Sequence, residues 1–490
     1  MIPLTIENIA VAAEGTLYGS EKLAQFQITN IVTDSRVFEQ ENKADQTAFL
    51  ALKGANFDGH RFVKAVVEND CIAVIVEQHL PAFDENQIAQ IVVQETRDAL
   101  GKLGAYVKKV VAPKTVAITG SSGKTTVKEM VAAILSRLGN VLATLGNFNN
   151  EIGVPLTLLR LDKTHEFAVI ELGANHIGEI AYTTNLVKPD VAVINNIAAA
   201  HLEGFGDLCG VARAKGEIFS SLTSQGVALY NKDTRYTDKW QWRLIDKNVR
   251  TFSCFSEADC FSSDVQLDQL GCASFQLHTR QGQCLVKLNI PGKHNVCNAV
   301  AAASIALEFG ASLDDICHGL AQMKPVKGRL NLYQLTDKVK LIDDSYNANV
   351  ESAKAAAQLL ASYPGKQILI LGDMGELGAQ ARSYHQQVGE FAAELDINTL
   401  LTLGVLSQSA CDGFCANKSI NEANSSQHFS HKDDLLNHIY EEFNQLLSDS
   451  EEQIAILIKG SRSAHMEHVV KAIIEWFEQY EALQNKEVIS

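Results

Sequence analysis

A strand, a glycine-rich turn and an amphipathic helix follow one another without interruption between residues 115 and 139. Residues 115–119 are apolar and rich in β-branched side chains, and the turn at residues 120–126 reads Gly-Ser-Ser-Gly-Lys-Thr-Thr. Apolar side chains then recur at helical spacing until Gly139, which ends the pattern. In this order the N–H groups of the turn and the helix N-terminus can hold a phosphate group. The segment therefore predicts a parallel sheet with a nucleotide site at its edge.

All seven turn residues are predicted nucleotide contacts: Gly120, Ser121, Ser122, Gly123, Lys124, Thr125 and Thr126. Lys124 is expected to neutralise the outer phosphates, and the Thr125 hydroxyl is expected to bind Mg²⁺. The full phosphate-loop pattern requires glycine at position 118, where this chain has Ile118, so only the shorter pattern G-x-x-G-K-T-T is met. A glycine turn before an exposed helical lysine fits the shorter pattern as well, but the flanking strand and helix favour a phosphate loop.

Strand-like and helix-like segments alternate along most of the 490 residues, and at about 150 residues per domain this length indicates three domains. A polar stretch at residues 81–87 and a Lys-Pro-Val-Lys-Gly linker at residues 324–328 mark the breaks. We predict an α/β fold with a small N-terminal α/β domain at residues 1–84, a central P-loop parallel-sheet domain of the ATPase type at residues 85–325, and a Rossmann-like C-terminal domain at residues 326–490.

The chain carries 42 Lys and Arg against 58 Asp and Glu, a formal net charge of −16. Such acidity argues against a nucleic-acid partner, so any anionic ligand must be held by a few placed groups. No apolar run reaches the roughly 18 residues of a spanning helix, and residues 1–19 lack the basic start of a secretory signal. We therefore predict a cytoplasmic protein with no membrane partner. The ten cysteines are scattered, which favours free and mostly buried thiols over a zinc site.

The loop at residues 119–126 is similar to that of the Mur ligases, the ATP-dependent amide-forming enzymes of peptidoglycan precursor synthesis. Further segments that resemble the family occur on both sides of this loop, in the family's order, at residues 33–36, 146–155, 171–176, 195–206, 214–217, 294–295, 328–329, 343–349 and 459–462. The resemblance therefore spans all three predicted domains. Such an ordered set is far more specific than any one segment.

Within this family the chain looks closest to the enzymes that join D-alanyl-D-alanine to UDP-N-acetylmuramoyl-tripeptide. The resemblance implies that ATP phosphorylates the tripeptide carboxylate, and that the dipeptide amine then attacks the acyl phosphate. It also implies these two molecules as the partners of a monomeric enzyme. The third residue of the tripeptide stays open between diaminopimelate and lysine.

The resemblance places Thr125 and Glu171 on a Mg²⁺ ion between the β- and γ-phosphates of ATP. It places His201 and Lys215 at a second Mg²⁺ ion, with Lys215 carbamylated by CO₂ into a carboxylate-like group. Imidazole is a poor ligand for Mg²⁺, so the role of His201 follows from the resemblance alone. Lys215 also fits an ordinary helix lysine paired with Glu217. The implied catalytic residues are Lys124, His201, Lys215 and Arg329.

Three residues outside the loop are implied as further nucleotide contacts. Asn295 resembles the adenine contact, Asp344 the ribose contact, and Arg329 the arginine that reaches the γ-phosphate when the C-terminal domain closes. Helix capping or surface polarity also explains each of them. Their position beside an interdomain linker favours a functional role, because closing domains exclude water and complete a site.

Contacts with the two substrates are implied at separate places in the chain. The candidates are Ser35, Arg36, Asn149, Asn150, His176, Asn347 and Lys459. The first two look like the grip on the UDP end of the precursor, although a strand-end turn has the same pattern. Residues 372–378 and 459–462 are candidates for the dipeptide.

Other functions fit parts of the same pattern. Another Mur-type or folylpolyglutamate-type amide ligase is the nearest alternative, but the Asp-Asn-Pro-Arg motif of the diaminopimelate-adding ligases is absent, and folylpolyglutamate synthases lack a UDP-gripping N-terminal domain. A P-loop kinase or NTPase would use ATP without the dipeptide. The combination of Lys124, Glu171 and His201 with Lys215 disfavours a non-catalytic nucleotide-binding scaffold.

Overall fold

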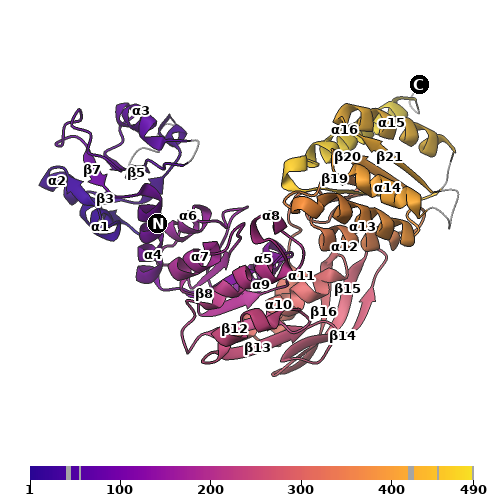
Figure 1. The fold of residues 1–490 in the computed structure, drawn as a ribbon, viewed down its shortest axis with the longest axis horizontal. Coiled ribbons are helices and arrows are strands. Elements are labelled where there is room, and N and C mark those ends of the chain that lie inside the picture. The colour runs from indigo at the N-terminus through magenta and orange to yellow at the C-terminus, as the bar shows by residue number, and fades with distance from the viewer. Residues whose placement is uncertain (40–45, 55–56, 418–423, 450–451, 488–490) are drawn as a thin grey trace.

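The computed structural model describes residues 1–39, 46–54, 57–417, 424–449 and 452–487. Its three large sheets have five, nine and six strands, and each belongs to one region of the chain. The regions follow one another along an open arch, with the N-terminal region at one end and the C-terminal region at the other (Figure 1). The predicted α/β fold with three domains is therefore confirmed.

The N-terminal domain has a sheet in the order β2-β7-β6-β5-β4. Its last strand, β7, pairs in parallel with β6 and antiparallel with β2. The predicted boundary after residue 84 would detach β7 from this sheet, so we place the boundary after Val92. The polar stretch at residues 81–87 is a loop inside this domain, between β6 and β7. Its polarity reflects exposure to solvent and does not mark a domain boundary. The elements are β1 (Leu4–Thr5), α1 (Ile6–Ala12), β2 (Thr16–Tyr18), α2 (Glu21–Ala24), β3 (Gln27–Ile28), β4 (Asn30–Val32), η1 (Ser35–Glu39), β5 (Thr47–Leu50), η2 (Gly59–Phe62), α3 (Val63–Glu68), β6 (Ala73–Val76) and β7 (Ala89–Val92).

The central domain holds a sheet in the order β16-β15-β14-β13-β12-β11-β8-β10-β9. Neighbouring strands from β9 to β14 are parallel, whereas β14, β15 and β16 are antiparallel. As the sequence predicts, β8 leads through the glycine turn into α5. Because the carboxyl ends of parallel strands lie at one edge, the turn meets the ends of β10 and β11 there.

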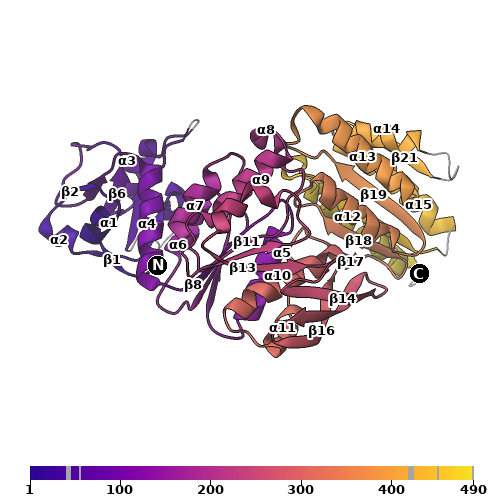
Figure 2. The same ribbon diagram turned by 60° about the horizontal axis from the view of Figure 1, so that its bottom comes forward.

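Helices cover both faces of this sheet (Figure 2). The strands are β8 (Lys114–Thr119), β9 (Val141–Ala143), β10 (Phe167–Glu171), β11 (Val191–Ile194), β12 (Val227–Asn231), β13 (Asn248–Ser253), β14 (Cys260–Leu267), β15 (Cys272–Thr279) and β16 (Gly282–Pro291). The helices are α4 (Thr96–Val111), α5 (Lys124–Leu135), α6 (Gly153–Leu159), α7 (Glu179–Val187), α8 (Leu202–Phe205), α9 (Leu208–Gly216), η3 (Glu217–Phe219), η4 (Thr237–Lys239), η5 (Gln241–Leu244), α10 (His294–Glu308) and α11 (Leu313–Ala321).

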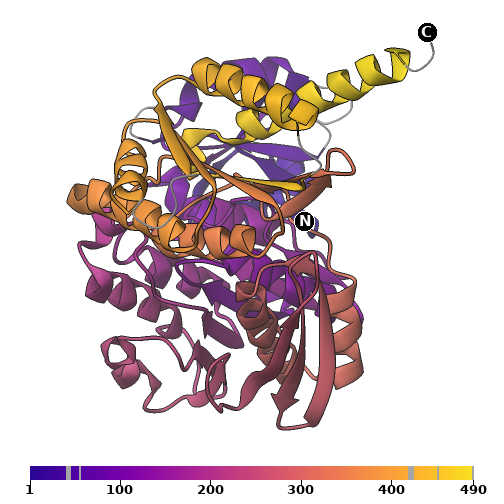
Figure 3. The same ribbon diagram turned by 90° about the vertical axis from the view of Figure 1, so that its right-hand side faces the viewer.

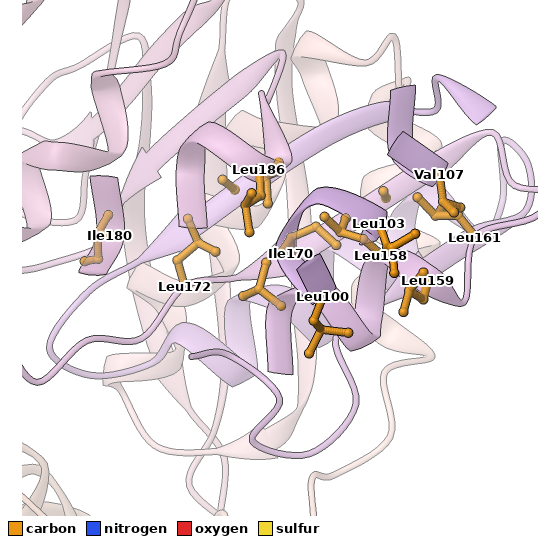
Figure 4. Packing of buried hydrophobic residues seen from close by; sticks show 14 of the residues in the cluster. Leu100, Leu103, Val107, Leu158, Leu159, Leu161, Ile170, Leu172, Ile180 and Leu186 are labelled. Carbon is orange, nitrogen blue, oxygen red and sulfur yellow. The ribbon is translucent and has the colours of Figure 1, made fainter. Parts of the chain in front are cut away.

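One apolar layer joins the N-terminal domain to the central sheet. Leu100, Leu103 and Val107 lie at helical spacing along α4 and belong to the same buried cluster as Ile170 of β10 (Figure 4). That cluster also contains Ile91 of the N-terminal sheet. Burying one such side chain stabilises the fold by about 1.5–3 kcal/mol. The first two domains therefore share a continuous core.

The C-terminal domain has a sheet in the order β17-β18-β22-β19-β20-β21, in which only the edge strand β17 is antiparallel to its neighbour. Helices lie on both sides of it, the doubly wound arrangement that the sequence predicts (Figure 3). The predicted boundary after residue 325 falls between α11 and β17. The elements are β17 (Asn331–Gln334), β18 (Val339–Asp344), α12 (Val350–Ala361), β19 (Lys366–Gly372), η6 (Gly378–Gln380), α13 (Ala381–Glu394), β20 (Thr399–Leu403), α14 (Gln408–Ala416), β21 (Ser425–Phe429), α15 (Lys432–Asp449), β22 (Ile454–Lys459), η8 (Arg462–Ala464) and α16 (Glu467–Glu487).

Two sequence expectations concern the chain as a whole. Within the described ranges, no helix combines the length and the apolar character needed to cross a bilayer. The expectation of free, mostly buried thiols is wrong in part, because Cys254 and Cys297 form a disulfide and only three of the other cysteines are buried. The fold brings these two residues to a Cα–Cα distance of 5.5 Å across a separation of 43 residues, a proximity that their spacing does not reveal.

Candidate active site

The glycine turn between β8 and α5 is held in shape by asparagines. Gly123 has a φ of +75°, in the left-handed region, and a Cβ there would lie 2.4 Å from Asn298 Oδ1. Glycine is the residue that adopts this conformation without strain. Directly after β11, Asn196 Oδ1 accepts the N–H of Ser122 at 2.9 Å, and Asn195 Nδ2 donates to the Ser122 carbonyl at 3.0 Å. Side chains of the protein itself therefore hold the turn in this shape.

Lys124 and Thr125 begin α5 beside an acidic partner. Lys124 Nζ donates to the Gly120 carbonyl at 2.8 Å, and burial lowers the pKa of this amine while Glu171 opposes the shift. Glu171 is 2% exposed at the end of β10, and its carboxylate accepts from Thr125 Oγ1 at 2.9 Å and from Asn149 Nδ2 at 2.8 Å. Because Thr125 and Asn149 are neutral donors, the Glu171 carboxylate can still attract a cation. Thr125 and Glu171 also offer the oxygen ligands that Mg²⁺ prefers, so this pair fits the ion.

Lys215 is 1% exposed on α9, and among the described residues its amine makes no hydrogen bond or ion pair. Burial first, and then the charge of Lys124, hold the pKa of Lys215 well below its usual value. The alternative pairing with Glu217 is wrong, because that carboxylate accepts the N–H groups of Gly178 and Ala181 around the start of α7. Glu217 therefore serves the helix terminus and leaves Lys215 without a counterion.

His201 lies at the start of α8 with a φ of +53°. Its ring meets Phe205 edge-on at 6.3 Å between centroids, and Lys215 Nζ lies 5.9 Å from the centroid of the same Phe205 ring. His201 Nδ1 lies 2.5 Å from Glu376 Oε2 of the C-terminal domain, and this neighbour lowers the pKa of the Glu376 carboxyl. The structure thus gathers His201 and Lys215 around one aromatic ring and adds an acid from another domain.

The C-terminal domain touches the phosphate loop at two points. Arg329 Nη2 donates to Thr125 Oγ1 at 3.1 Å, across 204 residues of sequence. Asn349 Nδ2 donates to the Ser121 carbonyl at 3.2 Å, across 228 residues. Thr125 therefore meets Glu171 of the sheet and Arg329 of the C-terminal domain with one hydroxyl. Arg329 thus lies beside the loop, while its contact with the γ-phosphate stays a prediction.

Asp344 and Lys459 end two neighbouring strands of the C-terminal sheet. They are register partners on β18 and β22, and Lys459 Nζ donates to Asp344 Oδ2 and, at 3.1 Å, to the Asn347 carbonyl. Lys459 is 2% exposed, whereas Asp344 is half-buried. Three predicted contacts, two from residues 343–349 and one from the end of β22, thus form one polar cluster, in which the charge of Lys459 already has a partner.

Asn295 supports the loop indirectly in this structure. Its Nδ2 donates to the Pro291 carbonyl at 2.7 Å, and its Oδ1 accepts from Asn298 Nδ2 at 2.9 Å. Asn298 Oδ1 in turn accepts from Asn195 Nδ2 at 3.2 Å. The Asn295 side chain therefore belongs to an asparagine chain that ends at the glycine turn.

Several predicted substrate contacts lie outside this cluster. Ser35 and Arg36 begin η1 in the N-terminal domain, where the exposed Arg36 donates to both carboxylate oxygens of Asp34, at 2.9 Å and 2.6 Å. Asn150 Oδ1 accepts the N–H of the first residue of α6 at 2.9 Å. Nδ1 of the exposed His176 lies 2.8 Å from Oε1 of Glu179, the first residue of α7. Arg36, Asn150 and His176 thus make local contacts, and in the described part of the chain no hydrogen bond joins these side chains to the glycine turn.

Sequence reasoning missed several residues that shape the site. Asn195 and Asn196 follow β11 at the edge where the turn lies, so their position directly after an apolar strand was an available signal. Glu376 lies within residues 372–378, which the sequence already suggests for the dipeptide, whereas Asn298 had no comparable signal, because only the packing of α10 brings it here. The residues that converge are Gly120, Ser121, Ser122, Gly123, Lys124, Thr125, Thr126, Asn149, Glu171, Asn195, Asn196, Asn298, Arg329 and Asn349.

A parallel sheet that carries a P-loop, with an arginine reaching the loop from a separate domain, defines a nucleotide-binding protein of the class that closes domains over a phosphate group. A family model described as the Mur ligase middle domain matches residues 118–306, and one described as the Mur ligase, glutamate ligase domain matches residues 328–462. The chain belongs to the Mur ligase family.

Relatives match the chain from end to end. It is 43% identical over 476 residues to the UDP-N-acetylmuramoyl-tripeptide–D-alanyl-D-alanine ligase of Escherichia coli (strain K12), which covers 97% of this chain and 99% of the relative. A crystal structure of MurF from Acinetobacter baumannii is 40% identical with a TM-score of 0.87, over 96% of this chain and 99% of that one. The MurF ligase from Thermotoga maritima in complex with ADP is 26% identical with a TM-score of 0.78, over 92% and 98%.

Proposed function

We propose that this protein is an ATP-dependent ligase that joins D-alanyl-D-alanine to UDP-N-acetylmuramoyl-tripeptide in the cytoplasm. The observation that carries the proposal is the similarity to a relative of that name over 99% of its length. The site supplies groups suited to such a reaction, because the phosphate loop, the Glu171 carboxylate and Arg329 of the C-terminal domain meet at Thr125.

The reaction proceeds in two steps. The free carboxylate at the end of the tripeptide attacks the γ-phosphorus of ATP and displaces ADP, which gives an acyl phosphate. The amine of D-alanyl-D-alanine then attacks the acyl carbon, loses a proton and expels phosphate. Phosphorylation is needed because a free carboxylate is a poor acceptor for an amine. Lys124 and Arg329 stabilise the charge that spreads over the transferring phosphoryl group, which is the main protein contribution to such steps.

The metal-binding roles rest on the donor groups present. Thr125 and Glu171 would hold one Mg²⁺, which supplies charge neutralisation at the β- and γ-phosphates. His201 and a carbamylated Lys215 would hold a second. The buried amine of Lys215, with its lowered pKa, supports this role, because only a neutral amine adds to CO₂. Addition of CO₂ to the neutral amine releases one proton and gives a carbamate anion, which is suited to a divalent metal.

The remaining site residues are proposed contacts, some with the nucleotide and some with the two substrates. We assign Asn295 to the adenine, with Asp344 to the ribose. The substrate contacts are Ser35, Arg36, Asn149, Asn150, His176, Asn347 and Lys459. The ion pair between Lys459 and Asp344 supports a shared site at the ends of β18 and β22. We further propose that the enzyme acts as a monomer.

Release of phosphate from ATP, with UDP-N-acetylmuramoyl-tripeptide present, tests the function. Release should require D-alanyl-D-alanine and should yield the pentapeptide product in equal amount. Release that ignores the dipeptide would indicate a kinase or NTPase and would overturn the proposal. Product formed from folate and glutamate would indicate the folylpolyglutamate-type alternative. Tripeptides ending in diaminopimelate and in lysine should be compared, and Lys124→Met serves as the inactive control.

A further inference from the structure

Tyr346 lies in the loop between β18 and α12, and the guanidinium carbon of Arg329 lies over its ring at 4.6 Å from the centroid. We propose that Tyr346 is a positioning residue, whose ring holds the Arg329 side chain in the orientation that reaches the phosphate loop. The inference rests on the proposed function, because it gives Tyr346 a task in the same phosphoryl-transfer step. Tyr346 itself is none of the proposed nucleotide or substrate contacts.

The contact between the two side chains is attractive. A guanidinium group over the face of an aromatic ring, within about 6 Å of the centroid, is drawn to the negative face of the π system, and the attraction grows as water is excluded. Tyr346 and Arg329 are both only half-exposed, so part of their surroundings is already protein. An attraction that acts at the ring face favours a narrow range of positions for the guanidinium group.

The Arg329 side chain has little other support. Among the described residues, its guanidinium group makes one hydrogen bond, from Nη2 to Thr125 Oγ1 at 3.1 Å. Its Nε is buried and has no hydrogen-bond partner in the same part of the chain. A single bond to a hydroxyl leaves the guanidinium group free to rotate about that bond. The ring of Tyr346 therefore supplies the second contact that defines an orientation.

Backbone contacts bring the ring to the arginine. The N–H of Tyr346 donates to the Gly328 carbonyl at 3.0 Å, directly before Arg329 in sequence. Gly328 has a φ of +71°, and a Cβ there would lie only 3.1 Å from Tyr346 Cβ. Glycine accommodates both the left-handed conformation and the close approach. The interdomain linker and the loop after β18 are thus joined next to the two side chains.

The loop that carries Tyr346 is fixed on both sides of the ring. Before it, Asp343 Oδ1 accepts the N–H of Ser345 at 3.0 Å. After it, Asn349 caps α12 and donates through Nδ2 to the Ser121 carbonyl at 3.2 Å. The ring therefore has a defined place relative to the phosphate loop as well as to the arginine.

A second arginine lies over the same ring but has another partner. The guanidinium carbon of Arg462 is 5.9 Å from the Tyr346 centroid, near the limit of such contacts. Arg462 Nη1 also donates to Glu467 Oε1 at 2.9 Å, so a carboxylate balances its charge. The ring of Tyr346 therefore acts mainly on Arg329.

A double-mutant cycle on kcat, measured by steady-state phosphate release, tests the pair. Tyr346→Leu should lower kcat by roughly 3- to 30-fold, whereas Tyr346→Phe keeps the ring and should stay within about 2-fold of wild type. In the Arg329→Ala background, Tyr346→Leu should cost less than about 2-fold, because no guanidinium group is left to orient. Equal losses with and without Arg329 would overturn the proposal.

The Michaelis constant separates positioning from direct contact with the nucleotide. KM for ATP should change by less than about 3-fold in Tyr346→Leu, because the ring acts on a group that stabilises charge developing in phosphoryl transfer. A rise in KM for ATP with unchanged kcat would assign the ring to nucleotide binding and overturn positioning.

Phe391→Leu is the matched control, because it removes a ring that faces Lys354 at 5.4 Å within the C-terminal domain. Its kcat should equal that of wild type. A loss as large as that of Tyr346→Leu would show a general effect of ring removal and would overturn the proposal. Wild-type phosphate release that ignores the dipeptide would refute the proposed function, whereas the cycle would still report on Tyr346 and Arg329 through that release.

Discussion

Lys124 and Lys215 bring two amines into one buried region, and the two differ in what surrounds them. Lys124 has a carbonyl acceptor and the nearby charge of Glu171, whereas Lys215 has neither a hydrogen bond nor an ion pair within the ranges that the structure describes. An amine without a counterion in a protein interior favours its neutral form. At the scale of the residue, the site therefore contains one lysine suited to binding anions and one suited to reacting with CO₂.

Removal of CO₂ tests the reactive lysine. Ligation by wild-type protein in rigorously CO₂-free buffer should fall, and added bicarbonate should restore it, because a carbamate forms reversibly on a neutral amine. Lys215→Arg should be weakly active and should not respond to bicarbonate. Phosphate release is the measurement. Full wild-type activity without CO₂ would contradict carbamylation.

The same amine determines the sign of a pH effect on stability. Burial holds the pKa of folded Lys215 well below the usual 10.5 of the unfolded chain. Between these two values the unfolded chain binds more protons, so the free energy of unfolding rises with pH, by at most about 1.4 kcal/mol per pH unit for one group. In CO₂-free buffer the Tm of wild type should therefore rise relative to that of Lys215→Met between about pH 7 and pH 9. Parallel curves for the two proteins would contradict the shift.

At the scale of elements, helix starts carry the contacts between domains. Helix α5 begins at the glycine turn, α8 begins at His201, and α12 begins with a capping box made by Asn349 and Ser352. The Asn349 side chain caps α12 through Oδ1 and reaches the Ser121 carbonyl through Nδ2. One side chain thus stabilises a helix and ties that helix to the phosphate loop.

Two substitutions separate these tasks of Asn349. Asn349→Ser retains a capping oxygen but loses the donor to Ser121, so Tm should stay near wild type while kcat/KM for ATP falls about 3- to 10-fold. Asn349→Ala loses both tasks and should also lower the stability of the C-terminal domain by about 1 kcal/mol. Thermal unfolding and ligation kinetics measure the two effects. Wild-type kinetics for the serine variant would show that the tie to Ser121 has no role.

At the scale of the whole molecule, the two boundaries between neighbouring domains differ in the kind of contact that holds them. The first two domains share one apolar core, whereas the polar contacts described above connect the C-terminal domain to the central one through Arg329, Asn349 and Glu376. Polar contacts at a domain boundary can be replaced by contacts with water when the domains part, whereas separating a continuous core would expose apolar surface. We therefore expect the C-terminal domain to be the part that moves during turnover.

Arg329 links that motion to chemistry. Arg329→Ala should lower kcat by roughly 10²- to 10³-fold with a smaller change in KM for ATP, because the arginine stabilises charge that develops only during phosphoryl transfer. Steady-state phosphate release measures both constants. Arg382→Ala, an exposed arginine on α13 of the same domain, is the control and should behave as wild type. Equal losses in the two variants would exclude a specific role for Arg329.

Local patterns were sufficient for the elements that form the nucleotide site. The strand, turn and helix around Lys124 are recognisable because backbone propensity, glycine conformation and apolar spacing all act over a few residues. The same holds for β10 and its terminal Glu171, a short apolar run that ends in an acid. The boundary after residue 84 failed because a polar loop inside a domain looks like a linker in sequence, and only the pairing of β7 with β2 and β6 distinguishes them.

The sequence by itself determined the α/β class, the three-domain organisation, the phosphate loop and the family, since each is encoded in short segments in a fixed order. Tertiary structure alone decided that Glu217 accepts N–H groups at the start of α7 instead of pairing with Lys215, that Asn349 reaches Ser121, and that Glu376 meets His201. These contacts join residues from about 40 to more than 200 positions apart. Their energies depend on packing and desolvation, which arise only when the chain has folded.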